Sequence, residues 1–459
     1  MMHQYPFHAP LLLPAASLAA GIAVGMPLSA VGVLCLLVGA IVAALFLGRW
    51  PFWQSAALGA GFLLLGMLLS PADEPRVADG TWTEAVVASA PAQRPKTIMA
   101  ELLLPSTGER RRCYLWSDER SQQLHVGQNL MVRIHDGQFI GRSDWRPGGD
   151  AFNHATSLQR LRIRALQWRG RLLERYRSME GDDEAQAVLA AMVLGDKSAL
   201  TRDLRQTYSS SGASHVLALS GLHLSIIYLL LSRLTLGRRR WWLTQVLVVL
   251  AIWAYALLTG LSVSVVRAAT MLTVYALFSL GGRRRSSLGV LSFTALVMLL
   301  VSPASLFDVG FQLSFMAMLA ILLFDPFFKG LISTRWLMEH RPVKWVYELA
   351  AVSLSAQLGT APLVAYYFGQ LPVWFLLTNL VVIPLATVIL HGAVLVLVVP
   401  ALGGALLWVV EVLNAFLEWE SRLPLASFSG LHPSPLQVVM AYVCIGVLLF
   451  ILSLKPAAK

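Results

Sequence analysis

The sequence predicts a polytopic α-helical membrane protein with an inserted small β-barrel, OB-like in type, outside the cytoplasm. Hydrophobic residues make up 56% of the 459 residues and charged residues only 13%, whereas about a quarter of a soluble domain is charged. Long apolar segments recur along most of the chain. One polar region, at 71–150, interrupts them with β-like alternation. These observations exclude a single soluble core.

Changes in composition divide the chain into four predicted regions. They are N-terminal transmembrane helices at 1–70, an OB-like domain at 71–150, basic amphipathic and re-entrant helices at 151–212, and a transmembrane domain at 213–459. No Lys or Arg precedes the first apolar run, so we interpret that run as a membrane segment and not as a cleavable signal peptide.

The polar region contains several short alternating runs, among them 97–104 and 129–137, and Gly and Pro separate them. Short strands with turn residues between them are typical of a small barrel or sandwich. An OB-type barrel fits this length, and such barrels often bind nucleic acid. Because fold does not determine function, a simple extramembrane spacer fits the same pattern.

Residues 156–179 carry seven arginines and one glutamate, with apolar residues interleaved at helical spacing. An amphipathic helix of this kind lies in the membrane interface beside anionic lipid headgroups. The alternative is a guide for a polyanion that approaches a pore. The arginines that we expect to serve as such a guide are Arg160, Arg164, Arg171 and Arg175. A helix at 182–204, broken at Gly195, is too short and polar to span, which favours a re-entrant or interfacial element.

The apolar segments after residue 212 are predicted membrane helices. They lie at 213–232, 241–259, 263–280, 286–302, 309–324, 345–365, 373–399, 402–421 and 436–454. The segment at 373–399 contains Pro384 and is either one long helix or broken pieces.

Charge places these segments relative to the membrane. Arginine clusters at 238–240 and 283–285 and the basic segment 329–344 mark cytoplasmic loops, and the alternate connections are nearly uncharged. The alternation predicts about twelve spans, both termini in the cytoplasm, and residues 71–212 on the extracytoplasmic side.

Polar residues recur inside these apolar segments. Candidates for lining a path are His215, Ser220, Gly221, His223, Arg267, Asp308, Gln312, Gln357 and Asn379. Each alone also fits an interhelical hydrogen bond, but together they favour a hydrated cavity or pore. Because a buried unpaired charge is costly, we expect Arg267 and Asp308 either to pair or to contact water.

Local catalytic chemistry is not supported by these residues. Ser220 and His223 are neighbours at i, i+3, but no acid stands at a spacing that would complete a nucleophilic site. His215 and His223 are more than two helical turns apart, and the ten histidines form no zinc motif. We therefore predict no catalytic residue, no metal ligand and no cofactor.

Several motifs together resemble a known family. The run SHVLALSGLHLS at 214–225 is similar to the signature of the ComEC competence proteins, which internalise DNA in bacterial natural transformation. Further matching stretches occur in the family's order at 193–200, 260–269, 302–315, 353–372 and 379–384. RPGGDAFNHATSL at 146–158 resembles a linker of the family with its residues displaced.

The resemblance implies a function. It implies an inner-membrane channel that passes single-stranded DNA to the cytoplasm, an OB-like domain that engages DNA outside, and membrane lipids as surroundings. It also implies other competence proteins as partners, including a separate nuclease and a cytoplasmic motor. Many relatives carry a C-terminal β-lactamase-like metal nuclease domain. The sequence ends after the last apolar segment, so we expect no enzymatic activity.

A second function remains open from the residues alone. A secondary transporter of a smaller anionic or polar solute would share the polar membrane residues, and it should show inverted repeats with paired broken helices. The sequence contains no clear internal repeat. The oligomeric state is not determined by any of these patterns.

Overall fold

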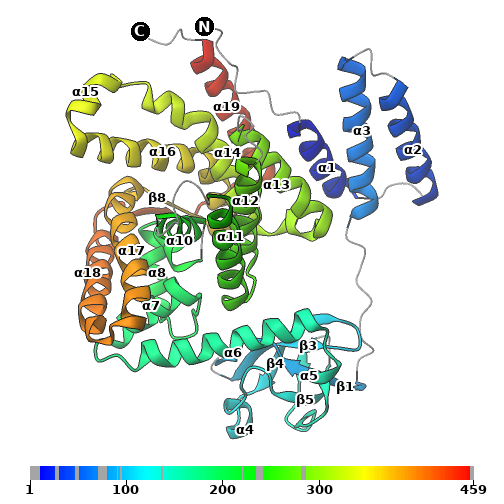
Figure 1. Cartoon of the computed structure of the whole chain (residues 1–459), viewed down its shortest axis with the longest axis vertical. Coiled ribbons are helices and arrows are strands. Elements are labelled where there is room, and N and C mark those ends of the chain that lie inside the picture. The colour runs from blue at the N-terminus through cyan, green and yellow to red at the C-terminus, as the bar shows by residue number, and fades with distance from the viewer. Residues whose placement is uncertain are drawn as a thin grey trace.

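The computed structural model describes residues 11–25, 30–46, 51–70, 80–89, 91–93, 96–135, 138–219, 221–233, 241–280 and 286–454. It consists of three N-terminal helices, a small sheet domain and a large helical part (Figure 1). Ser220 and the arginine clusters at 238–240 and 283–285 lie outside the described residues.

The N-terminal helices are α1 (Leu12–Val24), α2 (Ala30–Phe46) and α3 (Pro51–Leu69). Leu18 and Ile22 of α1 are buried against Leu299, far along the chain. This apolar contact joins the N-terminal helices to the large helical part.

The sheet domain follows the predicted alternation. Its strands are β1 (Trp82–Val87), β2 (Ala92–Gln93), β3 (Thr97–Leu104), β4 (Glu109–Trp116), β5 (Asn129–Arg133), β6 (Phe139–Ile140) and β7 (Trp145–Pro147), with α4 (Glu119–Gln122) between β4 and β5. The strand order is β6-β4-β3-β1-β5-β7, with β2 paired to β3. Only the β4–β6 pair is parallel. Cys113 and Leu115 of β4 are buried in the core, whereas Arg112 and Trp116 point outward, as period-two side chains must.

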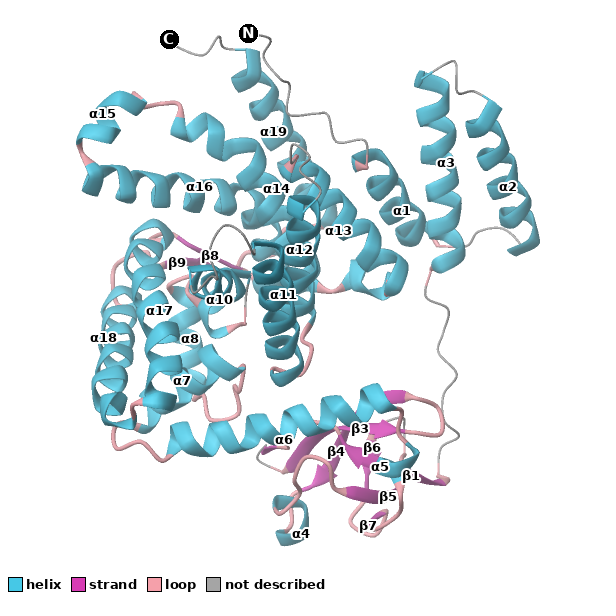
Figure 2. Ribbon diagram, viewed as in Figure 1, coloured by secondary structure: helices cyan, strands magenta, loops and turns pink. Residues whose placement is uncertain are grey.

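One long helix connects the sheet domain to the rest. After α5 (Ala151–His154), α6 (Ser157–Arg177) begins with a capping box between Thr156 and Gln159. Ile163 of α6 is buried with sheet residues, and Tyr176, near its other end, is buried in the largest helical core. Figure 2 shows α6 between the magenta strands and the cyan helices. The predicted basic amphipathic helix therefore forms a bridge between the two parts.

The break predicted at Gly195 is confirmed. α7 (Asp183–Leu194) ends there because Gly195 adopts the left-handed conformation that glycine tolerates. After a short loop, α8 (Arg202–Ser210) follows. α7 is buried along nearly its whole length, so it belongs to the helical core. A re-entrant or interfacial position for it stays a prediction.

The prediction of one membrane helix at 213–232 is wrong. The segment forms α9 (Ser214–Leu217), an extended Ala218, and α10 (Gly221–Arg233). Serine and glycine favour turns over a continued helix, which accounts for the break. α10 has 13 residues, about 20 Å at 1.5 Å per residue, and a bilayer core measures about 30 Å.

The remaining elements are mostly helices. They are α11 (Trp241–Leu258), α12 (Val263–Leu280), α13 (Ser287–Val301), η3 (Pro303–Phe307), α14 (Val309–Lys329), α15 (Thr334–Glu339), α16 (Arg341–Phe368), β8 (Gln370–Pro372), α17 (Phe375–Val398), η4 (Pro400–Leu402), α18 (Gly403–Ser421), β9 (Ser427–Ser429) and α19 (Pro435–Leu454). α17 settles the question at 373–399, because it continues as one helix through Pro384.

Five helices within the described residues are long and apolar enough to cross a membrane. They are Phe52–Leu69, Val309–Lys329, Arg341–Phe368, Phe375–Val398 and Pro400–Ser421. Six further apolar helices are shorter. The fold is therefore mostly helical with a small sheet, and these helices are consistent with a multi-pass membrane protein; the number of twelve spans stays a prediction.

Two arginines of α6 donate hydrogen bonds to two different turns of the helical part. Arg162 donates to the carbonyl of Gly260, just after α11, and Arg175 donates to the carbonyl of Leu397, near the end of α17. Strict alternation of spans would put these two turns on opposite sides of the membrane. A helix with seven arginines is too polar to cross the bilayer. The contacts of α6 therefore favour one side of the membrane for both turns, and the alternation predicted from charge stays a prediction at the α17–α18 turn.

Candidate functional site

Arg267 is the most unusual polar residue of the membrane helices. It lies on α12 and is 4% exposed. Its Nη2 donates to Ser264 Oγ at 3.2 Å. Its Nε and Nη1 are buried and have no hydrogen-bond partner. Such unmade hydrogen bonds are costly, especially for a charged group.

Asp308 lies near Arg267 but does not pair with it. Among the described residues, the ion pairs do not include these two, although they interact electrostatically. Asp308 caps α14 instead, accepting from the Phe311 N–H at 2.8 Å. A Cβ added at Gly310 would lie 3.0 Å from Asp308 Oδ1 and 3.5 Å from Ser264 Oγ. Of the two arrangements expected, the ion pair is therefore not formed, contact with water stays a prediction, and the start of α14 stands beside Ser264.

Gln312 connects this group to the end of α16. Its Nε2 donates to the Leu306 carbonyl at 2.9 Å, and its Oε1 accepts from the Tyr367 hydroxyl at 2.7 Å. Tyr367 is exposed and packs edge-on against Tyr366. Polar groups from α12, α14 and α16 thus lie close together.

The segment that is divided into α9 and α10 also approaches Arg267 of α12. A Cβ at Gly221 would lie 3.7 Å from Ala268 Cβ, next to Arg267 in sequence. His223 is fully buried, whereas His215 is exposed with its Nδ1 at 2.9 Å from the Gly212 carbonyl. The two histidines are near enough to interact electrostatically. The predicted residues Gly221, Arg267, Asp308 and Gln312 therefore form one group, which we call the α12 polar site, with Tyr367 added.

Two predicted residues lie outside this group. Gln357 on α16 and Asn379 on α17 are half-buried, and no side-chain hydrogen bond joins either of them to the described residues of the α12 polar site. Their assignment to a path stays a prediction.

The arginines of α6 divide into two sets. Arg162, Arg169, Arg175 and Arg177 anchor the helix, donating respectively to Gly260, Leu194, Leu397 and Asp196. Arg164 and Arg171 are exposed, and Arg160 is half-buried. The guanidinium carbon of Arg171 lies over the Trp168 ring, 5.0 Å from the ring centroid. Arg175, which we expected to guide a polyanion, therefore has a structural contact as well.

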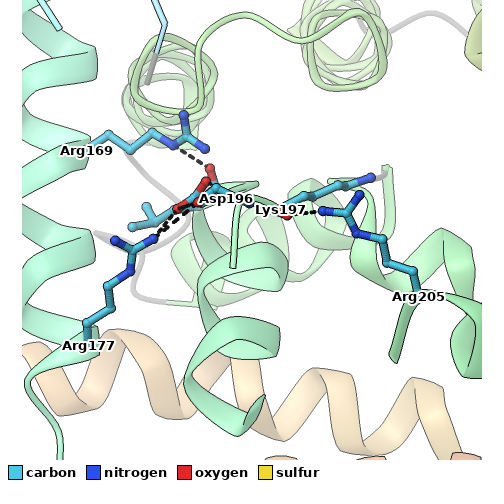
Figure 3. Close-up of polar contacts among 7 residues, drawn as sticks. Arg169, Arg177, Asp196, Lys197 and Arg205 are labelled. Atoms are coloured by element: carbon cyan, nitrogen blue, oxygen red, sulfur yellow. Dashed lines mark hydrogen bonds and ion pairs between the residues drawn. The ribbon is translucent and has the colours of Figure 1, made fainter. Parts of the chain in front are cut away.

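The sequence analysis includes 193–200 among the stretches that resemble the family, but it assigns no role to Asp196 in this loop. Asp196 is 6% exposed and accepts from Arg177 Nη2 at 2.9 Å and from Ser198 Oγ at 3.1 Å. Figure 3 shows Arg169 and Arg177 of α6 on one side of the loop and Arg205 of α8 on the other, where it donates to the Lys197 carbonyl. Burial lowers the pKa of Arg169, and nearby Asp196 opposes this.

This loop joins three elements of the fold. Besides α6 and α8, α11 contributes the Tyr255 hydroxyl, which donates to the Val193 carbonyl at 2.7 Å. The sequence signal was an acid directly after a helix-ending glycine, in a region where arginines exceed acids. The loop fixes α6 against the helical part.

No group of three or more His, Cys, Asp or Glu residues that could hold a metal ion occurs in the described part of the chain.

Comparison with known proteins identifies the family. Residues 192–455, more than half of the chain, match the family described as Competence protein. The chain belongs to this competence protein family. The matched region begins at the 193–200 loop and includes every residue of the α12 polar site. The sheet domain and α6 precede it.

Three relatives illustrate the similarity. ComE operon protein 3 of Bacillus subtilis (strain 168) is 27% identical over 330 residues, which cover 69% of this chain and 40% of that protein. Competence protein ComA of Neisseria gonorrhoeae is 28% identical over 316 residues, 63% of this chain and 42% of that protein. An uncharacterized protein of Aquifex aeolicus (strain VF5) is 32% identical over 257 residues, 52% and 58% respectively. The chain thus spans about half the length of these relatives. No solved structure matches it.

Proposed function

We propose that the protein passes single-stranded DNA across the cytoplasmic membrane during natural transformation. The observation that carries the proposal is Arg267, a buried guanidinium with two nitrogen groups that lack acceptors. Phosphate oxygens are strong acceptors for arginine. A DNA strand that passes the α12 polar site would supply the missing acceptors. Membership in the competence protein family selects DNA among anionic cargoes.

The residues around Arg267 fit this role. Gly221 is exposed at the start of α10, and the Tyr367 ring is exposed at the end of α16. A strand needs a hydrated route, positive charge for phosphates and aromatic faces for bases. The α12 polar site supplies the positive charge of Arg267 and the aromatic ring of Tyr367, so we assign it to the translocation path.

The sheet domain is, in our proposal, an OB-like barrel on the extracytoplasmic side. The order β4-β3-β1-β5, the parallel β4–β6 pair and α4 between β4 and β5 support this topology. OB-folds bind oligonucleotides on the face of their second and third strands, which correspond here to β3 and β4.

The outer face of β4 carries the side chains that such binding requires. Trp116 and Phe139 are exposed, Tyr114 stacks against Phe139, and Arg142 lies over Trp116. Aromatic rings flanked by arginines suit unpaired bases and phosphates. We assign this face to DNA that reaches the membrane.

α6 lies between the two proposed DNA contacts. Exposed Arg164 and Arg171 suit either phosphates or lipid headgroups, and the exposed Leu161 and Trp168 suit the membrane interface. We propose that α6 lies on the outer membrane surface and directs the strand from the sheet domain to the helical part. A separate nuclease and a cytoplasmic motor complete the process in this proposal, and this chain has no enzymatic role.

A transformation assay tests the proposal. In a strain without its own copy, the wild-type gene should restore entry of labelled DNA into the cytosol. Arg267→Ala should lower transformation on the order of 100-fold, because losing charge-assisted hydrogen bonds costs about 3 kcal/mol. Arg335→Ala is the matched control, since Arg335 is 92% exposed. Normal transformation by Arg267→Ala at normal protein level would contradict the assignment of the site.

A further inference from the structure

A second buried polar group lies apart from the α12 polar site. Glu420 of α18 is fully buried. Its Oε1 lies 2.5 Å from Thr378 Oγ1 of α17, and its Oε2 is buried without a hydrogen-bond partner. No basic residue in the described ranges forms an ion pair with it; the nearest arginine in sequence, Arg422, pairs with Glu418. A carboxylate that is buried without a cation is strongly disfavoured relative to the neutral acid.

The neighbours of Thr378 lead to the same conclusion. Its Oγ1 lies 2.9 Å from the Ser211 carbonyl oxygen and 3.0 Å from the Trp374 carbonyl oxygen. Carbonyl oxygens only accept, and a hydroxyl has one proton to donate. If Glu420 were ionised, the Thr378 hydroxyl would have to donate to it, and the Ser211 carbonyl would lose the Thr378 hydroxyl as a donor, whereas the Trp374 carbonyl still accepts from the Thr378 backbone N–H. A protonated Glu420 donates to Thr378, which leaves the Thr378 proton for Ser211.

The segment held in this way leads into the family signature. Ser211 ends α8, and Gly212 follows with φ +79° against Pro372 of β8. The Tyr208 hydroxyl donates to Asn414 Oδ1 of α18 at 2.8 Å. α17, α18 and β8 therefore enclose the turn that precedes α9 and His215.

We propose that Glu420 is a positioning residue that keeps its proton. Its hydrogen bond to Thr378 and the hydrogen bond from Thr378 to the Ser211 carbonyl, which together we call the relay, hold the turn at the start of the translocation path. The inference rests on the proposed function, because the held segment leads to Gly221 beside Arg267. Ionisation of Glu420 would turn the Thr378 proton away from Ser211 and loosen that turn.

Four variants test the relay in the full-length protein. Glu420→Gln keeps a donor and Thr378→Ser keeps the hydroxyl, so both should transform near the wild-type level. Glu420→Ala and Thr378→Val break the relay and should lower transformation about tenfold. A purely packing role would make Thr378→Val, which keeps the side-chain volume, harmless. Equal loss in Glu420→Gln and Glu420→Ala, at equal protein level, would overturn the proposal.

Two measurements report on Glu420 without DNA. The infrared spectrum of purified wild-type protein should contain a protonated-carboxyl band that Glu420→Gln removes; loss of an ionised-carboxylate band instead would overturn the proposal.

Ser214 is exposed, so a Ser214→Cys probe, with Cys35, Cys113 and Cys444 replaced, reports on the turn. Its thiol labelling should accelerate in Glu420→Ala and not in Glu420→Gln.

These readouts separate the two proposals. If wild-type protein fails to admit DNA while the infrared and labelling results hold, the translocation function fails and the relay stands. If DNA enters normally and labelling is the same in all variants, the relay fails and the translocation function stands.

Discussion

At the scale of the residue, two charged side chains that are buried to a similar degree have different surroundings. Asp196 is buried and fully bonded by Arg177 and Ser198. Arg267 is equally buried but has two nitrogen groups without acceptors. The first arrangement stabilises the fold, because it leaves no lone charge. The second is suited to an anionic ligand that comes and goes.

A pH dependence is expected at Glu84 of β1. Its Oε2 lies 2.9 Å from His154 Nδ1, and this hydrogen bond chiefly lowers the pKa of Glu84 below its usual 4.5. A lowered carboxyl pKa stabilises the fold above the unfolded value, and the stabilisation is lost as pH falls through the folded value. Glu84→Gln should therefore lower the Tm near about pH 6 and not near about pH 3. Thermal unfolding at both pH values checks this; an equal Tm difference at both would contradict it.

At the scale of the element, each segment is shaped by the partner it packs against. α6 has the amphipathic pattern of a surface helix, yet its arginines bind the carbonyl of Gly260 after α11, a carbonyl of α17 and a loop aspartate. α7 is short, but its burial by α17 and α18 makes it a core helix. Strand β4 has one side in the core of the sheet domain and an outer side with exposed Trp116.

The outer side of β4 provides a test of DNA recognition. Trp116→Ala should weaken binding of single-stranded DNA about ten- to hundredfold, because stacking on one base is worth about 1–3 kcal/mol. Duplex binding should change little, since its bases are already stacked. Fluorescence anisotropy of the purified protein with labelled oligonucleotides measures both. An equal loss for duplex and single strand would assign Trp116 to folding and not to base contact.

At the scale of the whole molecule, the sheet domain and the helical part are joined by α6 (Figure 1). Ile163 is buried against the sheet and Tyr176 against the helices, and the Tyr176 hydroxyl donates to the Ala393 carbonyl at 3.1 Å. One rigid helix therefore sets the distance between the two proposed DNA contacts. It also contacts both the Gly260 turn and the end of α17, through Arg162 and Arg175.

These contacts predict that both turns lie on the extracytoplasmic side, and thiol labelling tests this. Ser262→Cys and Ala401→Cys replace exposed residues at the two turns. In a background without the native cysteines, both should react with a membrane-impermeant reagent in intact cells, while Glu339→Cys on α15 should react only after permeabilisation. Labelling of Ala401→Cys only after permeabilisation would place the α17–α18 turn in the cytoplasm, as the alternation of spans predicted from loop charge requires.

Composition and local patterns were enough for the membrane class, the alternating strands, the capped amphipathic helix and the break at Gly195. Each depends on residues near one another in sequence. The division of the 213–232 segment was misjudged, because apolar residues outnumbered the Ser and Gly that end a helix. The missing Arg267–Asp308 ion pair, the Arg177–Asp196 bond and the Glu420–Thr378–Ser211 contacts involve residues between 19 and 167 positions apart in sequence. Only packing brings such groups together, since hydrogen bonds and burial depend on distance in space and not on separation along the chain.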